Sequence, residues 1–339
     1  MDIHALLRLA VEKKASDLHL SSGEAPIVRL DGELERLAFP VLNPAELLTS
    51  LHQILTEPQK KQVEEKNEID FSYVVPALAR FRVNIFWQHR GVSAAFRTIP
   101  FSIPTLEQLE LPKIFEAFCA FSNGLVIVTG PTGSGKSTTL AAMINYINHR
   151  TENRKHIITI EDPIEYLYDD VHSLIQQREV GNQTKGFDKA LRAALREDPD
   201  IILVGEMRDL ETIQLALTAA ETGHLVFATL HTSSAAQSID RIIDVFPVGE
   251  KEMIRTMLAE SLKAIIAQML LKRPEGGRRA AIEIMLCTPA IRNLIREHKV
   301  AQIYSIIQTQ KALGMRTMEQ HVEELVRKNL VIHPERSIL

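Results

Sequence analysis

The sequence predicts an α/β fold, a parallel sheet with crossover helices, preceded by a smaller α+β domain. From Gly124 onward, short apolar runs alternate with helical stretches, which is typical of parallel strands connected by helices. Before Pro100, strand-like pieces lie on either side of two helix-like stretches. We therefore expect an N-terminal domain over residues 1–100, a proline-marked linker over 101–122 and the α/β domain over 123–339.

The N-terminal domain is expected to begin with a helix over residues 3–13. Strand-like pieces follow at 27–30, 69–73 and 79–86, and helix-like pieces at 44–55 and 57–65. In the last strand, Phe81, Val83 and Ile85 alternate with polar residues, which predicts a strand buried on one face. Asp31-Gly32, between two apolar runs, predicts a hairpin turn.

Four apolar runs of the α/β domain are expected to form parallel strands. They are residues 125–129, 157–160, 201–204 and 225–229. Polar residues follow each run. In open α/β sheets, ligands bind beyond the carboxyl ends of the strands, so these polar residues are expected to share one site.

The region beyond Gly249 is expected to be mainly helical. Seven apolar residues recur there at helical spacing: Met257, Leu258, Leu262, Ile265, Ile266, Met269 and Leu270. We interpret them as a core face rather than a membrane-lying face, because the residues opposite them are not strongly basic.

A complete phosphate-loop motif, G-x-x-x-x-G-K-[ST], follows the first strand. It consists of Gly130, Pro131, Thr132, Gly133, Ser134, Gly135, Lys136 and Ser137, with Thr138 next in the following helix. The glycines let backbone N–H groups converge on a β-phosphate, the lysine reaches the β/γ oxygens, and the serine hydroxyl ligates Mg²⁺. The helix N-terminus adds positive charge. The sequence therefore predicts a nucleoside-triphosphate site rather than an accidental glycine turn.

Two carboxylates are candidates for hydrolysis. Glu206 follows the third strand, in the Walker-B position, and Gly205 stands where many such enzymes place an aspartate. The segment 160–165 can supply the second acid. We expect Glu165 to hold the attacking water and Glu206 to lie on the Mg²⁺ side, although these roles could be exchanged. The alternative for either residue is a solvated acid at a strand end.

Histidines and arginines supply further candidates. His224 and His231 bracket the fourth strand, and each alone would be a hydrogen-bonded structural histidine. His231, however, follows a strand that ends at the nucleotide and could sense a γ-phosphate. Arg80, Arg82 and Arg97 lie on strands of the first domain as expected solvated-face residues. The alternative is an arginine that reaches the γ-phosphate from another domain or subunit.

The composition is that of a globular protein with its own cores. Of 339 residues, 45% are hydrophobic and 24% charged. The apolar runs are far shorter than the ~20 residues of a membrane span, and the first residues lack the pattern of a secretory signal. Cys119 and Cys287 form neither a CxxC pair nor a disulfide framework. A reducing cytoplasm fits these features.

The charge pattern does not favour nucleic acid as a partner. The formal net charge is −4, and basic residues are interleaved with acidic ones. The short clusters Lys272-Arg273 and Arg278-Arg279 are interpreted as parts of a solvated loop.

Taken together, the motifs resemble those of the secretion-superfamily ATPases. In chain order they are residues 16–20 (Ser-Asp-Leu-His-Leu), the phosphate loop or Walker A, 160–165 (Asp box), 204–209 (Walker B) and 222–232 (His box). Residues 290–297 are similar to the signature of the type IV pilus retraction ATPases. Extension and type II secretion relatives usually carry a four-cysteine zinc site and an extra N-terminal domain, and this sequence shows neither.

The resemblance implies a hexameric ring of two-domain subunits, each with a PAS-like N-terminal domain and a RecA-like core that hydrolyses ATP with Mg²⁺. The site residues that it implies are Lys136, Ser137, Glu165, Glu206, His231, Arg82 and Arg97. It also implies a motor at the cytoplasmic face of the inner membrane that engages a platform protein; assistance by a second retraction ATPase stays open.

Residues 290–297 have the pattern of an amphipathic helix with Ile291, Leu294 and Ile295 on one face. From the residues alone this is ordinary helix packing. The resemblance implies instead that the segment converts hydrolysis into pilus retraction.

Two other functions stay open at this point. A secretion or DNA-uptake ATPase with a different cargo would show the same nucleotide motifs. A nucleotide-gated scaffold would bind ATP with negligible turnover, and the two candidate carboxylates speak against it.

Overall fold

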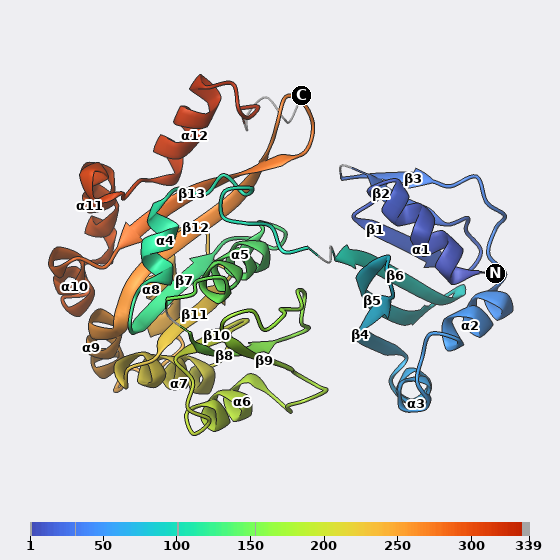
Figure 1. Ribbon diagram of the computed structural model, residues 1–339, viewed down its shortest axis with the longest axis horizontal. Helices are drawn as coiled ribbons and strands as arrows, with labels where there is room; N and C mark the ends of the chain where they lie inside the picture. Colours follow the sequence, from blue (N-terminus) through green and yellow to red (C-terminus); the bar gives the residue numbers. More distant parts are fainter. Residues whose placement is uncertain (1, 31, 100–101, 153, 334–339) are drawn as a thin grey trace. The chain divides into compact units, whose positions relative to one another are not determined.

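The chain folds into two compact units, each with its own sheet and core (Figure 1). The computed structural model describes residues 2–30, 32–99, 102–152 and 154–333. By backbone contacts, the first unit extends to Ser102 and the second begins at Ile103; the short segment Glu165–Leu167 groups with the first.

The first unit contains a six-stranded antiparallel sheet in the order β3-β2-β1-β6-β5-β4. The strands are β1 Asp17–Ser21, β2 Ile27–Leu30, β3 Glu33–Arg36, β4 Glu68–Val75, β5 Ala79–Gln88 and β6 Gly91–Ile99, and the helices are α1 Ile3–Glu12, α2 Pro44–His52 and α3 Glu57–Lys66. Leu30 pairs with Glu33 across the turn between β2 and β3. Of the predicted hairpin residues, Asp31 lies outside the described residues and Gly32 has a φ of 96°.

The alternation of β5 places its apolar residues in the core, as predicted. Phe81, Val83 and Ile85 are at most 1% exposed and pack in one cluster with residues of α1 and α2. The expectation of a solvated face is wrong for Arg80, which is buried and donates from Nη2 to the Ser72 hydroxyl at 2.8 Å. A long arginine side chain can bury its methylene stem along apolar surface while the guanidinium group keeps a polar partner.

The second unit contains a seven-stranded sheet in the order β13-β12-β7-β11-β10-β8-β9. The strands are β7 Gly124–Thr129, β8 His156–Glu161, β9 Leu174–Glu179, β10 Ile201–Val204, β11 Leu225–Leu230, β12 Leu262–Lys272 and β13 Arg278–Leu286. All neighbouring strands are parallel except the antiparallel pair β12 and β13. The four predicted parallel strands β7, β8, β10 and β11 are confirmed, and they are adjacent.

Helices cover both faces of this sheet. The described helices are α4 Ile114–Cys119, α5 Lys136–Asn148, α6 Phe187–Ala194, α7 Leu210–Glu221, α8 Ala235–Asp244, α9 Lys251–Ser261, α10 Pro289–Arg296, α11 Ile303–Thr309 and α12 Met318–Arg327. In β7, Val126 and Val128 face the core under α4 and α5, whereas Leu125 and Ile127 face the core under α6 to α9. Strands buried on both faces appear in the sequence as continuous apolar runs.

Helix α4 lies within residues 101–122, the segment expected to be a linker. Its Phe115 and Phe118 are fully buried and pack against α5 and the sheet. Residues from Ile114 onward are therefore part of the second unit's core.

The expectation of a mainly helical region beyond Gly249, with a helical apolar face that includes Leu262 to Leu270, is wrong between Leu262 and Leu286. Helix α9 ends at Ser261, and the chain continues as the hairpin β12–β13 before α10 begins at Pro289. Ala264, Ile265, Ile266 and Ala267 are all fully buried, so β12 is covered on both faces. In such a run, periodicity does not separate a strand from a buried helix.

Helix α10 is amphipathic, as predicted. Ile291 and Ile295 are fully buried in the core, and Leu294 packs against them while partly exposed. Thr288 caps the helix by accepting a hydrogen bond from the Ile291 N–H, and Pro289 occupies the first turn.

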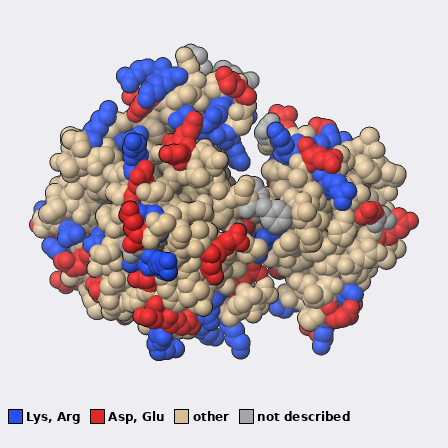
Figure 2. Space-filling view, in the orientation of Figure 1, with Lys and Arg blue, Asp and Glu red and all other residues tan. Residues whose placement is uncertain are grey.

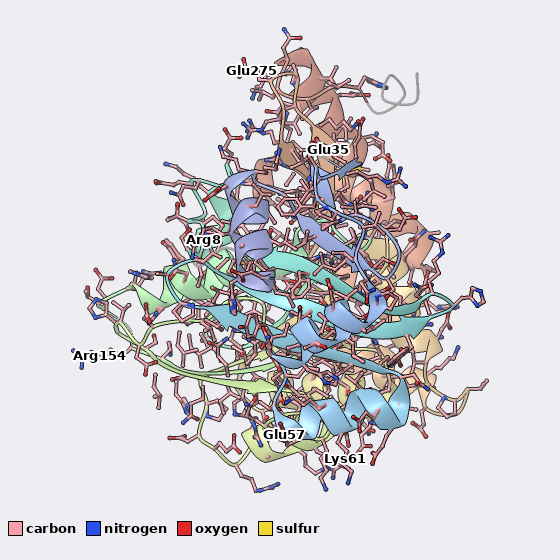
Figure 3. All side chains as sticks on the ribbon, turned by 90° about the vertical axis from the view of Figure 1, so that its right-hand side faces the viewer. Arg8, Glu35, Glu57, Lys61, Arg154 and Glu275 are labelled. Atoms are coloured by element: carbon pink, nitrogen blue, oxygen red, sulfur yellow. The ribbon has the colours of Figure 1, made fainter. Side chains whose placement is uncertain are left out.

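The surface carries charges of both signs. On the face drawn in Figure 2, Lys and Arg side chains alternate with Asp and Glu. Figure 3 shows four exposed charged residues at the edge of the first unit: Arg8 on α1, Glu35 on β3, and Glu57 and Lys61 on α3. No helix in the described part of the chain has the length and apolarity needed to cross a membrane.

Candidate nucleotide-binding site

The phosphate loop connects the end of β7 to the start of α5 and depends on its glycines. Gly130, Gly133 and Gly135 have φ values of 146°, 77° and 85°, a region that disfavours other residues. A Cβ on Gly130 would lie 2.2 Å from the backbone oxygen of Gln268. The loop can therefore lie directly against the sheet only because Gly130 has no side chain.

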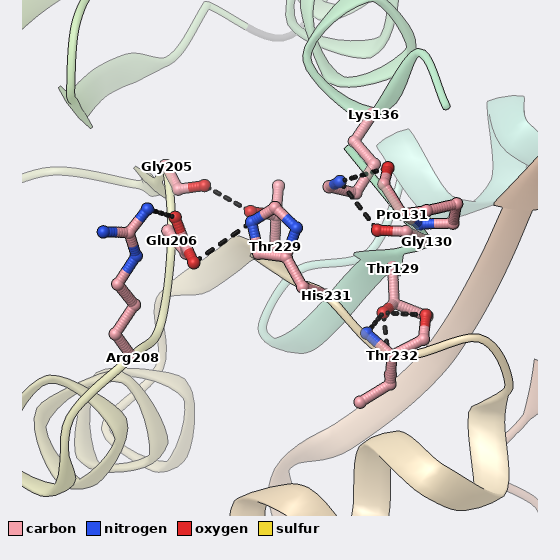
Figure 4. Close-up of polar contacts among 10 residues, drawn as sticks. All are labelled: Thr129, Gly130, Pro131, Lys136, Gly205, Glu206, Arg208, Thr229, His231 and Thr232. Atoms are coloured by element: carbon pink, nitrogen blue, oxygen red, sulfur yellow. Dashed lines mark hydrogen bonds and ion pairs between the residues drawn. The ribbon is translucent and has the colours of Figure 1, made fainter. Parts of the chain in front are cut away.

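Lys136 lies within the turn that the loop makes (Figure 4). Its Nζ donates to the carbonyl oxygens of Gly130 at 2.8 Å and Pro131 at 3.0 Å, and the residue is 8% exposed. Ser137 is exposed beside it in the first turn of α5, and Thr138 is half-buried. The unpaired N–H groups of a helix N-terminus and the lysine ammonium together favour an anion at this position.

Glu206 follows β10 and is held by a guanidinium group and an imidazole ring. Its carboxylate lies 2.6 Å from Arg208 Nη2 and 3.1 Å from His231 Nε2 (Figure 4). Burial acts to raise the pKa of Glu206, but the hydrogen bonds and charges of Arg208 and His231 outweigh it, and the net pKa is lowered. The carboxylate is therefore ionised at neutral pH and can serve as a metal-side or water-orienting group.

The packing explains why the residue before it is glycine. A Cβ on Gly205 would lie 2.9 Å from the Ile160 carbonyl oxygen and 3.2 Å from the Glu161 Cα. An aspartate at this position would require β8 and β10 to move apart at their ends.

His231 follows β11 directly, and Figure 4 shows it between Glu206 and the phosphate loop. The structure thus brings this predicted sensor next to the predicted carboxylate. His224, at the opposite end of β11, lies 3.0 Å from the Ala219 carbonyl oxygen through Nδ1, which fits the structural interpretation given to it.

Three threonines hold the strand ends in register around the site. The Thr129 hydroxyl, at the end of β7, accepts from the Thr232 N–H at 2.9 Å and lies 2.8 Å from the Thr232 hydroxyl. The Thr229 hydroxyl donates to the Gly205 carbonyl, and the Met207 N–H donates to the Thr229 carbonyl at 3.1 Å. These contacts were not predicted: Thr229 and Thr232 lie within residues 222–232, but that motif gave them no role, and Thr129 ends an apolar strand.

Glu165 lies in the segment after β8 and is not joined to Glu206. Among the described residues, its side chain makes no hydrogen bond or ion pair. The neighbouring Ile164 N–H donates to the Glu179 carboxylate at 2.9 Å, and Glu179 is 4% exposed. A buried carboxylate on β9 therefore anchors the backbone that carries Glu165.

Arg82 and Arg97 lie opposite each other on neighbouring strands. They are paired in the register of β5 and β6, so both side chains share one face of the first unit's sheet. Arg82 is bound by Asp70 at 2.6 Å and Arg97 by Asp17 at 3.0 Å. Like charges directly opposite each other destabilise a sheet, and these aspartates offset that cost.

The family model described as "Type II/IV secretion system protein" matches residues 1–335. The chain belongs to this family. The fold class predicted from the sequence, a RecA-like core with a smaller N-terminal α+β domain of PAS type, is confirmed.

Two curated relatives in this family are similar over nearly the whole chain. The type IV pilus retractation ATPase PilT of Pseudomonas aeruginosa is 56% identical over 331 residues, which cover 98% of this chain and 96% of that protein. The twitching motility protein of Neisseria gonorrhoeae is 52% identical over 325 residues, which cover 94% of this chain and 86% of that protein.

A solved structure is also similar. The crystal structure of the pilus retraction motor PilT with bound ADP matches with a TM-score of 0.89 and 47% identity, covering 98% of this chain and 95% of that one. The predicted resemblance to pilus retraction ATPases is thereby confirmed.

Proposed function

We propose that this protein is a motor ATPase that hydrolyses ATP to power type IV pilus retraction, and so twitching motility. The observation that carries the proposal is the convergence of Lys136, Glu206 and His231 at the carboxyl ends of three neighbouring strands. The similarity to PilT proteins, one of them solved with ADP, supports both the nucleotide and the cargo.

The donor set suits Mg²⁺. Ser137 offers an exposed hydroxyl at the start of α5, and Glu206 offers an ionised carboxylate. Mg²⁺ prefers oxygen ligands and is usually held by one or two protein groups together with substrate phosphates and water. When bound, the ion neutralises charge on the β- and γ-phosphates.

The residues of this chain would divide the remaining work. Lys136 binds the β/γ oxygens, and the N–H groups of residues 133–138 surround the phosphates. Glu165 orients the attacking water and Glu206 supports the metal side, or the two exchange these roles. His231 donates from Nε2 to Glu206 and, when its ring is protonated, can also donate from Nδ1 to the γ-phosphate, which would link the γ-phosphate to the Walker-B segment.

Arg82 and Arg97 are proposed to reach the γ-phosphate from the N-terminal domain, proposed over residues 1–100, of the same or a neighbouring subunit. Their adjacent positions on β5 and β6 support this role, because two guanidinium groups on one face can bind the same anion when they exchange Asp70 and Asp17 for it. Such arginines act chiefly on the charge that develops in the transition state.

The assembly and location are proposed from the same family argument. The motor would be a homo-hexamer at the cytoplasmic face of the inner membrane, with no membrane span of its own. It would engage a platform protein, and residues 290–297 would convert hydrolysis into pilus retraction; whether a second retraction ATPase acts beside it stays open.

The decisive experiment measures Mg²⁺-dependent phosphate release by the purified, assembled protein, together with piliation and twitching in cells that carry Lys136→Ala. We expect turnover in the unaltered protein, and hyperpiliated cells without twitching for the variant. Absence of turnover with and without cellular partners would overturn the motor proposal and leave the nucleotide-gated scaffold. Turnover by the unaltered protein together with normal twitching in cells that carry Lys136→Ala would overturn the assignment to pilus retraction and favour another cargo.

A further inference from the structure

Strand β12 packs directly against the phosphate loop, although the spacing of its apolar residues predicted a helix. It runs parallel to β7, and the pairing reaches Ala267 opposite Thr129, the last residue of β7. Gln268, the next residue, therefore lies directly beneath Gly130. A Cβ placed on Gly130 would lie only 2.2 Å from the Gln268 carbonyl oxygen, because the two backbones are in direct contact.

The Gln268 side chain binds the loop region at two points. Its Nε2 donates to the Ser134 carbonyl oxygen at 2.6 Å, and its Oε1 accepts from the Thr139 hydroxyl at 2.8 Å. Ser134 precedes Lys136 and Thr139 follows it, so one amide spans the part of the loop that carries the lysine.

This amide is buried and its orientation is defined. Gln268, Ser134 and Thr139 are 3%, 3% and 1% exposed. If the amide were flipped, its oxygen would face the Ser134 carbonyl oxygen, an acceptor against an acceptor. A buried amide that lost either partner would not regain it from water.

Fixing the Ser134 carbonyl also fixes a donor that points the other way. In a trans peptide, the C=O of one residue and the N–H of the next point in opposite directions. The Ser134 carbonyl points to β12, so the Gly135 N–H points away from it, on the side where the loop receives phosphate. A Cβ on Gly135 would lie 2.9 Å from Gln268 Nε2, so another residue type there would displace the glutamine amide.

We propose that Gln268 is a positioning residue that holds the phosphate loop in its anion-binding shape and thereby sets the affinity for nucleotide. The inference rests on the proposed function, since it concerns the same nucleotide site. It adds a residue outside every motif that identified that site.

The test compares Gln268→Met with the unaltered full-length protein by calorimetric titration with ADP and Mg²⁺. Methionine keeps the length and volume of glutamine but makes neither hydrogen bond. Losing these two buried hydrogen bonds, which shape the loop, should raise the Kd for ADP about tenfold or more. A Kd within twofold of the unaltered protein would overturn the proposal.

Ser261→Ala is the matched control. Ser261 is also 3% exposed and precedes β12, but it donates its hydroxyl to the Met257 carbonyl within α9. A merely structural role for Gln268 predicts that both variants lower Tm and leave the Kd for ADP unchanged. If the unaltered protein binds no ADP, the proposed function fails, and that outcome is distinct from failure of the inference.

Gln268→Glu provides a second test that depends on the hydrogen bond itself. An ionised carboxylate cannot donate to the Ser134 carbonyl, whereas a protonated carboxyl can. We expect the ratio of the variant's Kd to that of the unaltered protein to be large at pH 8 and to shrink as the pH is lowered. The charged residue of the adjoining loop, Lys136, is present in both proteins, so the ratio of their Kd values reports the change at position 268. A ratio that does not change with pH would overturn the hydrogen-bond account, even if Gln268→Met fails to fold.

Discussion

At the scale of single residues, Glu206 is the best-defined acid of the site because Arg208 and His231 fix its carboxylate. Glu165 is positioned differently, through the backbone that Glu179 anchors. The two carboxylates predicted from the sequence therefore have unequal support, and kinetics can separate them.

We expect Glu206→Gln and Glu165→Gln each to lower kcat by about 10² or more, because each removes a charge that orients water or metal. The measurement is steady-state phosphate release, with Glu197→Gln as the control, since Glu197 forms an exposed ion pair with Arg178. Unchanged rates in both site variants would exclude roles for these acids in hydrolysis.

Arg82→Ala and Arg97→Ala should lower kcat more than they weaken nucleotide binding, by up to about 10³ or more if either arginine contacts the transition state. Arg36→Ala is the control, because Arg36 on β3 of the same sheet forms an ion pair with Glu24. A rise in the Kd for ATP without a change in kcat would show that the arginines act only on the ground state.

The stability of the fold is expected to depend on pH through His321. Burial lowers the pKa of His321 to about 4 from its ordinary value of 6.5, and the ring accepts a hydrogen bond from the Ile282 N–H at 2.9 Å. Between these values the unfolded chain binds a proton that the folded chain does not, so stability falls as the pH is lowered through this window.

Denaturant unfolding at several pH values between 7 and 4 measures this effect. His321→Asn, which keeps an acceptor for the Ile282 N–H, should lose that component of acid sensitivity. The exposed His89→Asn should retain it. Equal pH profiles for the unaltered protein and His321→Asn would contradict the prediction.

At the scale of elements, the motifs and the four apolar runs predicted the centre of the sheet, and with it Lys136, Glu206 and His231. A parallel strand order brings strand ends together, so residues that follow those strands can be grouped from their positions in the chain alone. Arg82 and Arg97 could be named but not paired, because register depends on turns and on distant strands.

The sequence pattern failed where burial removes periodicity. β12 is covered on both faces, so its apolar residues carry no signal of period two. With the strand mispredicted, Gln268 had no assigned place. The threonine contacts at Thr129, Thr229 and Thr232 also could not be predicted, because they join strands that are far apart in the chain.

Helix α10 gives an element-scale prediction that separates stability from motor function. Ile291→Ala should lower the free energy of unfolding by about 2–5 kcal/mol, because Ile291 is fully buried. Leu294→Ala, at a partly exposed position, should spare ATPase activity but abolish twitching and leave cells hyperpiliated.

The measurements are denaturant unfolding, phosphate release and surface motility. Leu313→Ala is the control for loss of exposed apolar surface, since Leu313 is 50% exposed outside α10. Normal twitching in the Leu294 variant would contradict a role for this helix in retraction.

At the scale of the whole molecule, the two units have separate cores. Apolar residues of the first unit form one cluster, and those around the second unit's sheet form others. Units with separate cores can unfold in separate transitions.

We expect ADP with Mg²⁺ to raise the melting temperature of the second unit only. At a ligand concentration of 100 times Kd, the free energy of unfolding of that unit should rise by about 2.7 kcal/mol. Scanning calorimetry measures this, and Val83→Ala, in the first unit's core, identifies the other transition. Lys136→Ala should abolish the shift. An equal shift of both transitions would contradict confinement of binding to the second unit.

The contact between Gln268 and Ser134 joins residues 134 positions apart in the chain. During synthesis, the ribosome therefore delivers the complete glycine-lysine motif long before the strand that must lie beneath it. A nascent chain that ends before β12 contains the complete Walker A motif but lacks the strand that packs against it. If Gln268 sets the affinity for nucleotide as proposed, tight binding would therefore begin only after β12 has joined the sheet.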